Sequence, residues 1–132
     1  MHEGKVFYFM KDKKRDAVIV EKVLRYCDEI SKTHEAFHND KDLFFNKEDG
    51  FIYRNSITMP ILQIGELIKN LSEEFTSKYN AMPWKAIAGM RDIFAHHYGS
   101  IDYEMTWNTS IDDIDMLKKY LLEVKEDESF LN

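Results

Sequence analysis

The residues of this chain that are best suited to chemistry lie within the stretch WKAIAGMRDIFAHHYGS, residues 84–100. Arg91 and His96 stand five residues apart there, toward the end of an otherwise mostly apolar segment. A neutral histidine can take the proton from a ribose 2′-hydroxyl group, and a protonated histidine can give one to the departing 5′-oxygen. A guanidinium group can hold the phosphate and stabilise the charge that develops on its oxygens. The pair therefore suits metal-independent cleavage of RNA by internal attack.

The spacing within this stretch predicts how Arg91 is placed. Trp84, Arg91 and Tyr98 are seven residues apart and share one stripe of a helix, so Arg91 occupies a position that the period assigns to an apolar contact. An arginine at such a position must reach solvent, pair with a carboxylate or face a polar site. Glu66 is a candidate carboxylate, and Gly65 beside it would let a neighbouring helix come close.

The angular separation of Arg91 and His96 around the helix axis disfavours a single site formed by both side chains. The two positions lie roughly 140° apart around an ideal helix, so one helix does not easily direct both side chains to one point. Two solutions remain open. Either the helix unwinds before Gly99, or a second subunit brings a symmetric copy of the stripe alongside, which would gather two arginines and two histidines around one cleft.

Apolar residues also recur at helical spacing in three other segments. The first runs from Lys11 to about Phe37, the second is interrupted by Pro60, and the third begins at about Asp102. At Pro60 we expect a kink or a late start of the helix. In order along the chain, the apolar positions are Ile19, Val23, Cys27 and Ile30, then Ile57, Ile61, Ile64, Ile68 and Leu71, then Ile114, Leu117, Leu121 and Val124.

These segments and the Trp84 helix predict an all-α fold, an antiparallel bundle of four to five helices that forms a single domain over residues 1–132. Between the first two helices we expect a polar connection in which Asn46, with Asp49 three residues on, caps the next helix. Residues 1–9 form a leader that is either disordered or packed on a second subunit. The last six residues are expected to fray.

Composition limits the function classes. The chain has 132 residues, 44% of them hydrophobic and 32% charged, which is typical of a soluble globular protein. Its net charge of −6 argues against broad contact with nucleic acid, and no DNA partner is expected, although a local basic site is compatible with it. Neither a membrane span nor a signal peptide is evident. The single cysteine, Cys27, excludes an internal disulfide and fits the reducing cytoplasm.

The octet RDIFAHHY extends the catalytic pair into a longer motif. It matches Arg-x4-His-x-Tyr, with Arg91, His96 and Tyr98 in the fixed places and Asp92 in the polar place after the arginine. The segments RNSITMPILQIGELIKNL, PWKAIAGMRD and DYEMTW accompany it in the same order. Together they resemble the HepT-like toxins of the HEPN superfamily, over roughly the whole span from the end of the leader to Glu126.

The resemblance implies an all-helical homodimer with a composite active site in its interface cleft. It also implies a ribonuclease toxin whose partner is a minimal nucleotidyltransferase (MNT) antitoxin, which transfers AMP from ATP to the motif tyrosine, here Tyr98. Arg91 and His96 are then the catalytic residues, without metal or cofactor. Asp92, Glu66 and His97 are candidate supporting residues, although His97 falls on a variable position of the motif, where packing is favoured. The alternative is a HEPN-fold protein that binds a nucleotidyltransferase without catalysis.

A rival motif is HEAFH, residues 34–38, which fits the zinc-protease pattern His-Glu-x-x-His. A zinc protease needs a third ligand and a substrate cleft, and neither is evident. We therefore expect His34 and His38 to be two solvent-facing histidines at a helix end.

Other polar and aromatic residues have simpler interpretations. Arg54 and Asn55 either contact phosphate or, as we favour, form an exposed polar turn. The run Asp112–Asp115 is expected to be a solvated acidic face. Trp84 and Trp107 are expected in the core rather than stacked on a base.

Overall fold

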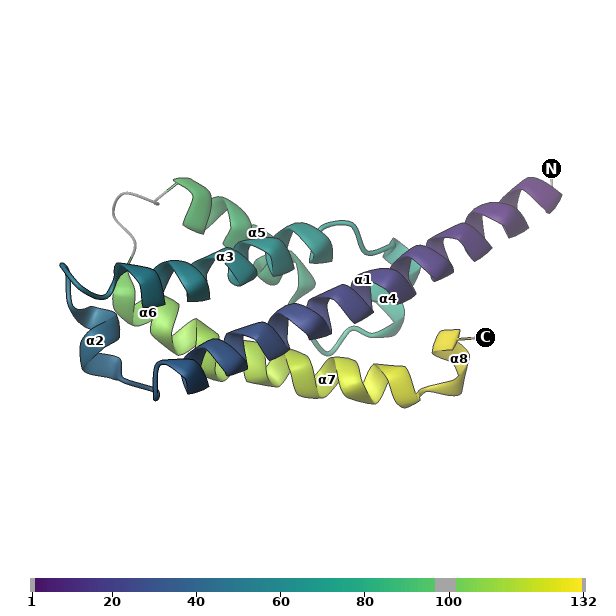
Figure 1. The fold of residues 1–132 in the computed structure, drawn as a ribbon. Helices are drawn as coiled ribbons and strands as arrows, with labels where there is room; N and C mark the ends of the chain where they lie inside the picture. The colour runs from purple at the N-terminus through teal and green to yellow at the C-terminus, as the bar shows by residue number, and fades with distance from the viewer. Residues whose placement is uncertain (1, 97–101, 132) are drawn as a thin grey trace.

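The computed structural model describes residues 2–96 and 102–131, with side chains at 11–94 and 102–130, and every regular element in these ranges is helical (Figure 1). The predicted all-α class is thus confirmed. The α-helices are α1 (His2–Ala36), α2 (Lys41–Phe45), α3 (Phe51–Ile68), α4 (Glu73–Lys78), α5 (Trp84–His96), α6 (Tyr103–Asn108), α7 (Ile114–Glu126) and α8 (Glu128–Leu131), and a π-helix, η2 (Thr109–Asp113), joins α6 to α7.

The long helices pack side by side in alternating directions (Figure 1). α1 contacts both α3 and α7, and α3 contacts α5 on its other side. The first turns of α1 project beyond the rest of the bundle, and residues 2–9 belong to this helix rather than to a separate leader. None of the helices in the described ranges combines the length and the apolar character needed to cross a membrane.

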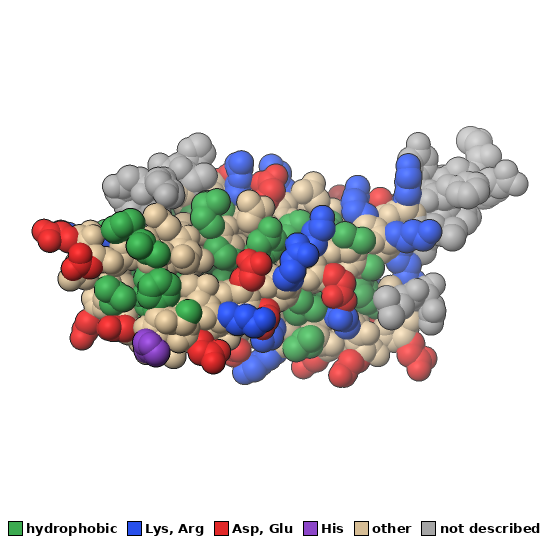
Figure 2. Space-filling view, in the orientation of Figure 1, with side chains coloured by type: hydrophobic (Ala, Val, Ile, Leu, Met, Phe, Trp, Pro, Cys, Tyr) green, Lys and Arg blue, Asp and Glu red, His purple; other side chains and the backbone are tan. Residues whose placement is uncertain are grey.

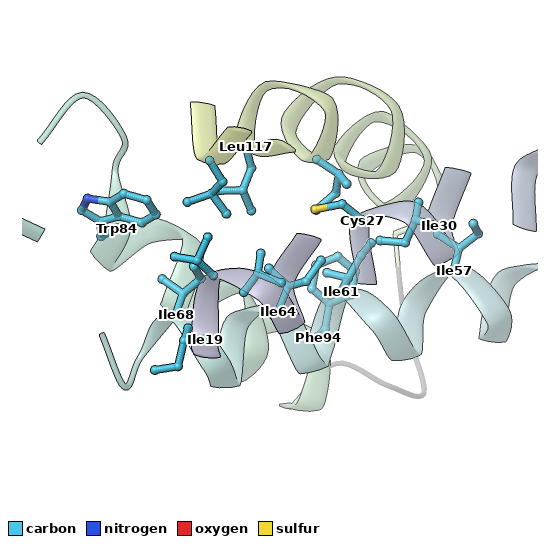
Figure 3. Close-up of a cluster of buried hydrophobic side chains, with 14 of the residues drawn as sticks. Ile19, Cys27, Ile30, Ile57, Ile61, Ile64, Ile68, Trp84, Phe94 and Leu117 are labelled. Atoms are coloured by element: carbon cyan, nitrogen blue, oxygen red, sulfur yellow. The ribbon is translucent and has the colours of Figure 1, made fainter. Parts of the chain in front are cut away.

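The core forms where the apolar stripes of α1, α3, α5 and α7 meet (Figure 3). The predicted stripe positions are buried, apart from Leu71, which is half-buried. α5 adds Phe94 to the cluster, and Trp84 and Trp107 are buried as predicted. Truncation of such a buried side chain to alanine lowers the free energy of unfolding by about 2–5 kcal/mol. The cluster contains residues of both α3 and α5, so it holds these two helices together.

The start of α3 differs from the prediction. The helix begins at Phe51 and continues through Pro60, so the late start is wrong. Its N-cap is Gly50, without a side-chain cap. The Asn46 side chain instead accepts hydrogen bonds from the backbone N–H groups of Glu48 and Asp49, at 3.0 and 2.9 Å. The predicted cap is wrong because Asn46 already stabilises the turn that precedes the helix.

The C-terminal end is also more ordered than expected. α8 places Phe130 against Phe75 and Tyr79, and 5% of the Phe130 side chain is exposed. The Asp127 carboxylate accepts a hydrogen bond from the backbone N–H of Ser129, at 3.1 Å. The expected fraying is therefore wrong for residues 128–131, because this short helix carries an aromatic anchor.

Candidate functional site

Arg91 lies at a close contact between α5 and α3. A Cβ atom added to Gly65 would stand 2.9 Å from Arg91 Cβ and 3.0 Å from the Arg91 backbone nitrogen. Since real Cβ atoms essentially never come that close, the helices can pack at this distance because residue 65 has no side chain. The close approach expected at Gly65 is confirmed.

The guanidinium group of Arg91 sits between two carboxylates. Arg91 Nε lies 3.1 Å from Glu66 Oε2 of α3, and Nη1 lies 3.3 Å from Oδ1 of the adjacent Asp92. The first contact is an ion pair without the alignment of a hydrogen bond, although Glu66 Oε2 itself is shielded from solvent. Neither contact uses Nη2. The structure thus brings Arg91, Glu66 and Asp92 together, as the sequence suggested for Glu66.

This site lies at the surface, not in the core. The side chains of Arg91 and Glu66 are each 46% exposed, and that of Asp92 is 64% exposed. Ion pairs with this exposure contribute about 0–1 kcal/mol to stability, so their main effect is to orient the guanidinium group. Arginine has five N–H donors, and those left free by the carboxylates can bind the oxygens of a phosphate.

The histidines and the tyrosine of the motif are described only in part. α5 remains helical to His96, so the positions of Arg91 and His96 lie roughly 140° apart around its axis. The helix therefore does not unwind between them. His97 and Tyr98 lie outside the described residues, as does the side chain of His96.

An exposed apolar stripe on α3 leads to this site. Ile52 and Met59 precede Glu66 at steps of seven residues, and their exposed fractions are 56% and 50%. Figure 2 shows hydrophobic side chains exposed among charged ones on one face of the molecule. The sequence pattern does not distinguish this stripe, because α3 is apolar on most of its circumference and only the packing shows which face is buried.

The predicted surface position of His34 is wrong. His34 is buried, with Nδ1 2.6 Å from the Tyr53 hydroxyl group and Nε2 2.8 Å from Ser110 Oγ. Ser110 Oγ donates its proton to the Trp107 carbonyl at 2.7 Å, so it accepts from Nε2–H, and Nδ1 accepts from Tyr53. Burial lowers the pKa of His34, which favours this neutral form.

The same contacts exclude the zinc-protease interpretation. Both ring nitrogens of His34 are occupied, and His38 lies in the turn after α1 with a φ of 57°, so the two histidines do not share a helix face. Within the described ranges, His, Cys, Asp and Glu side chains form no group of three that could hold a metal ion.

Arg54 is a structural residue, so both of its predicted alternatives are wrong. It is buried, and its guanidinium group donates to the backbone carbonyls of Phe44, Asn46 and Lys47 at 2.7, 2.6 and 3.3 Å. The guanidinium carbon also lies 4.2 Å from the ring centroid of Tyr103. The carbonyls at the end of α2 lack helical partners, and the guanidinium group of Arg54 donates hydrogen bonds to them instead. Asn55 is exposed.

Two simpler predictions are confirmed. Asp112, Asp113 and Asp115 are exposed, and Asp115 pairs with Lys119 at 2.8 Å, as expected for a solvated acidic face. Cys27 is buried, and burial raises the pKa of its thiol to about 12. The thiolate form that reacts is therefore disfavoured.

The chain is similar in sequence to a described protein family and to several named proteins. Residues 20–124 match the family described as Ribonuclease HepT-like. "Putative RNase TTE0752" of Caldanaerobacter subterraneus is 43% identical over 65 residues, which are 49% of this chain and 58% of the relative. "Gamma-glutamylcyclotransferase and putative RNase MJ0434" of Methanocaldococcus jannaschii is 41% identical over 96 residues, covering 73% and 39% of the two chains.

A third relative is covered more fully. "Putative RNase MJ0125" of Methanocaldococcus jannaschii is 30% identical over 109 residues, which are 80% of this chain and 86% of the relative. The chain spans about half the length of the other two relatives. No solved structure is significantly similar to the chain.

Proposed function

Because the chain belongs to the ribonuclease HepT-like family, we propose that it is a metal-independent endoribonuclease with Arg91 and His96 as its catalytic residues. The observation that carries the proposal is the Arg91–Glu66 ion pair, which holds a half-exposed guanidinium group five residues before His96 on the same helix. Asp92 and Glu66 orient Arg91, and His97 is a further supporting residue.

The reaction follows from these residue types. The ribose 2′-oxygen forms a bond to the adjacent phosphorus while the bond from phosphorus to the 5′-oxygen breaks. A neutral His96 takes the 2′-hydroxyl proton, and a protonated histidine donates a proton to the 5′-oxygen, which leaves a 2′,3′-cyclic phosphate and a free 5′-hydroxyl group. The free N–H donors of Arg91 stabilise the negative charge on the phosphate oxygens.

A homodimer supplies both histidines to one cleft. The roughly 140° between Arg91 and His96 disfavours a site built from a single α5. In a twofold dimer, His96 of the partner subunit can act as the acid while the first His96 acts as the base. The apolar stripe of Ile52 and Met59, which leads to Glu66, gives such an interface its hydrophobic contact.

We also propose that the nuclease is regulated by covalent modification of Tyr98. The chain is the toxin of a toxin–antitoxin pair, and an MNT-type nucleotidyltransferase is its antitoxin. The Tyr98 hydroxyl oxygen attacks the α-phosphorus of ATP, pyrophosphate leaves, and the hydroxyl proton is released. The AMP group attached in this way carries a negative charge that can pair with Arg91 and occupy the place of the RNA phosphate. The motif position of Tyr98, two residues after His96, supports this step.

Cleavage of RNA in the presence of EDTA tests the enzymatic proposal. The wild-type chain should cleave and leave 2′,3′-cyclic phosphate ends. Arg91→Ala and His96→Ala should each lower the rate by about 10²–10⁴-fold, the usual range for a lost acid–base group. The matched control is Arg25→Ala, which removes an exposed arginine of α1. If EDTA stops cleavage and zinc restores it, the proposed mechanism is wrong.

A second function has one observation in its favour. The net charge of −6 is unusual for a protein that binds RNA, and it favours a non-catalytic partner that dimerises and holds a nucleotidyltransferase. A stable complex with that enzyme, together with no RNA cleavage by the free chain, would establish this alternative.

A further inference from the structure

A groove between the C-terminal end of α3 and the N-terminal half of α5 has no part in the chemistry above. Its volume is about 740 Å³. Ile68 and Lys69 line it at the end of α3, and Trp84, Lys85 and Ala88 line it from α5.

The charge of this groove is opposite to that of the whole chain. The sequence has 24 acidic and 18 basic residues, yet the groove is lined by Lys69 and Lys85 and by no aspartate or glutamate. Both lysines are exposed, and neither forms an ion pair with a described residue. Two uncompensated ammonium groups in one groove favour a polyanionic ligand.

The groove lies about one helix turn from the candidate catalytic site, on the same pair of helices. α3 and α5 run in opposite directions (Figure 1), and Ile68 and Ala88 line the groove from these two helices. Gly65 precedes Ile68 by three residues in α3, and Arg91 follows Ala88 by three in α5; these two residues form the close contact described above. Three residues correspond to a rise of about 4.5 Å along a helix, so groove and Arg91 occupy successive turns of the same helix pair.

The aromatic residue of the groove is not available to a base. Trp84 is 7% exposed, its indole N–H donates to the Tyr79 carbonyl at 2.6 Å, and its ring packs against Phe75 and Tyr120. A base therefore has no free indole face on which to stack. The ligand contacts that remain are those between the ammonium groups and phosphates, which do not depend on base identity.

We propose that this Lys69–Lys85 groove binds the phosphates of a single RNA strand whose scissile phosphate lies at Arg91. The proposal rests on the ribonuclease function above and extends it, because it assigns substrate contacts outside the catalytic motif. It explains how an acidic chain can bind RNA: the strand follows a local basic path and avoids the rest of the surface. Contacts of this kind weaken steeply with salt.

The test compares long and short ligands in the double variant Lys69→Gln/Lys85→Gln. The probe for binding is a 2′-O-methyl RNA of about 12 nucleotides, long enough to fill a groove of this kind and unable to react. The variant should bind it several-fold more weakly at low salt, and the slope of log K against log salt should fall by about 0.7 for each lost phosphate contact. Cleavage of a dinucleotide, whose single phosphate is the scissile one and which therefore has no further phosphate for the lysines to contact, should be unchanged.

The control is Lys22→Gln/Lys47→Gln, which removes two exposed lysines that do not line the groove and should leave the slope as in wild type. Light scattering of both variants reports the oligomeric state.

If wild type cleaves RNA but the double variant keeps its affinity and salt slope, the groove proposal is wrong and the proposed nuclease function is unaffected. If the double variant changes oligomeric state instead, the groove is a protein contact and the proposal is also wrong. If wild type binds the probe through the lysines but cleaves no RNA, the groove is supported and the nuclease function is wrong.

Discussion

Gly65 of α3 and Arg91 of α5 meet where a β-carbon on residue 65 would come within 2.9 Å of Arg91 Cβ. The absence of a side chain at this position sets the distance between the two helices. Glu66, the next residue of α3, holds the Arg91 guanidinium group at 3.1 Å. The helix contact and the orientation of Arg91, the proposed catalytic arginine, are therefore coupled.

Gly65→Ala should damage both stability and activity. The added methyl group also meets the Arg91 backbone nitrogen at 3.0 Å, so the helices must move apart, which costs about 1–3 kcal/mol. A displaced Arg91 should lower the rate of RNA cleavage as well. Urea unfolding and initial rates would measure the two effects.

Gly89→Ala is the matched control for that prediction. It adds the same methyl group to α5, but a Cβ there meets nothing within 4 Å. Since alanine favours a helix over glycine by about 0.5–1 kcal/mol, this variant should be as stable as wild type or more stable. Equal stability and activity in Gly65→Ala and wild type would contradict the proposed role of the contact.

Glu66→Gln should lower activity with little change in stability. The substitution keeps the shape of the side chain and removes the charge that orients Arg91. An ion pair this exposed contributes about 0–1 kcal/mol to stability, so the melting temperature should hardly move. We expect a larger effect on kcat than on KM, because the proposed mechanism has Arg91 act mainly in the transition state. Asp92→Asn should have a smaller effect, and equal kcat values for Glu66→Gln and wild type would show that Glu66 does not position Arg91.

His34 should make the stability of the fold depend on pH. Burial holds its pKa in the folded state below the ordinary value of 6.5. The unfolded chain therefore takes up a proton that the folded chain does not, and stability is lost as the pH falls through 6.5, by at most about 1.4 kcal/mol per pH unit. Urea unfolding between about pH 7 and pH 5 measures this slope. His34→Gln should be less stable at neutral pH but should show a shallower slope, and an unchanged slope would assign the effect to other groups.

Periodicity predicted the core but not the buried polar residues. The stripes of α1, α3 and α7 follow from spacing alone, because burial of one helix face requires a repeat of three and four residues. His34 is buried because Ser110, 76 residues away, supplies one of its hydrogen-bond partners. Arg54 is buried because its guanidinium group donates hydrogen bonds to the carbonyls of Phe44 and Asn46 at the end of α2. Such pairings depend on tertiary contacts that a spacing pattern does not contain.

Only part of the candidate site could be predicted from the sequence. Arg91, Glu66 and Gly65 could be related to one another because each occupies a definite position on its own helix. The Lys69–Lys85 groove could not, because Lys69 at the end of α3 and Lys85 at the start of α5 become neighbours of one cavity only when the two helices pack. The exposed stripe of α3 was hidden for a similar reason, since α3 is apolar on both its buried and its exposed faces.

Met59→Lys should weaken the proposed homodimer. Met59 lies midway between Ile52 and Glu66 on the exposed stripe of α3 and is itself half exposed. A lysine there puts a charge into the interface without disturbing the core, so the monomer should remain folded and activity should fall with dimer content. Light scattering and thermal unfolding measure the two properties. The control is Met116→Lys on α7, at an exposed methionine outside this stripe. A monomeric variant with full activity would contradict the composite site.

Modification of Tyr98 should silence the nuclease. Tyr98 follows Arg91 by seven residues and His96 by two in the sequence, so we expect an AMP group on its hydroxyl to place a phosphate beside the proposed catalytic arginine. Incubation with the cognate nucleotidyltransferase, ATP and Mg²⁺ should add the mass of AMP and abolish RNA cleavage. Intact-mass spectrometry follows the modification, and a cleavage assay follows the activity.

Tyr98→Phe separates modification from simple binding. It lacks the hydroxyl nucleophile, so it should gain no mass and should continue to cleave RNA in the presence of the nucleotidyltransferase and ATP. Tyr79→Phe is a suitable control, because the Tyr79 hydroxyl group donates to Asp127 at 2.8 Å and belongs to the packing of α8. That variant should be modified and silenced like wild type. Neutralisation of Tyr98→Phe to the wild-type extent would show that the antitoxin acts by binding alone.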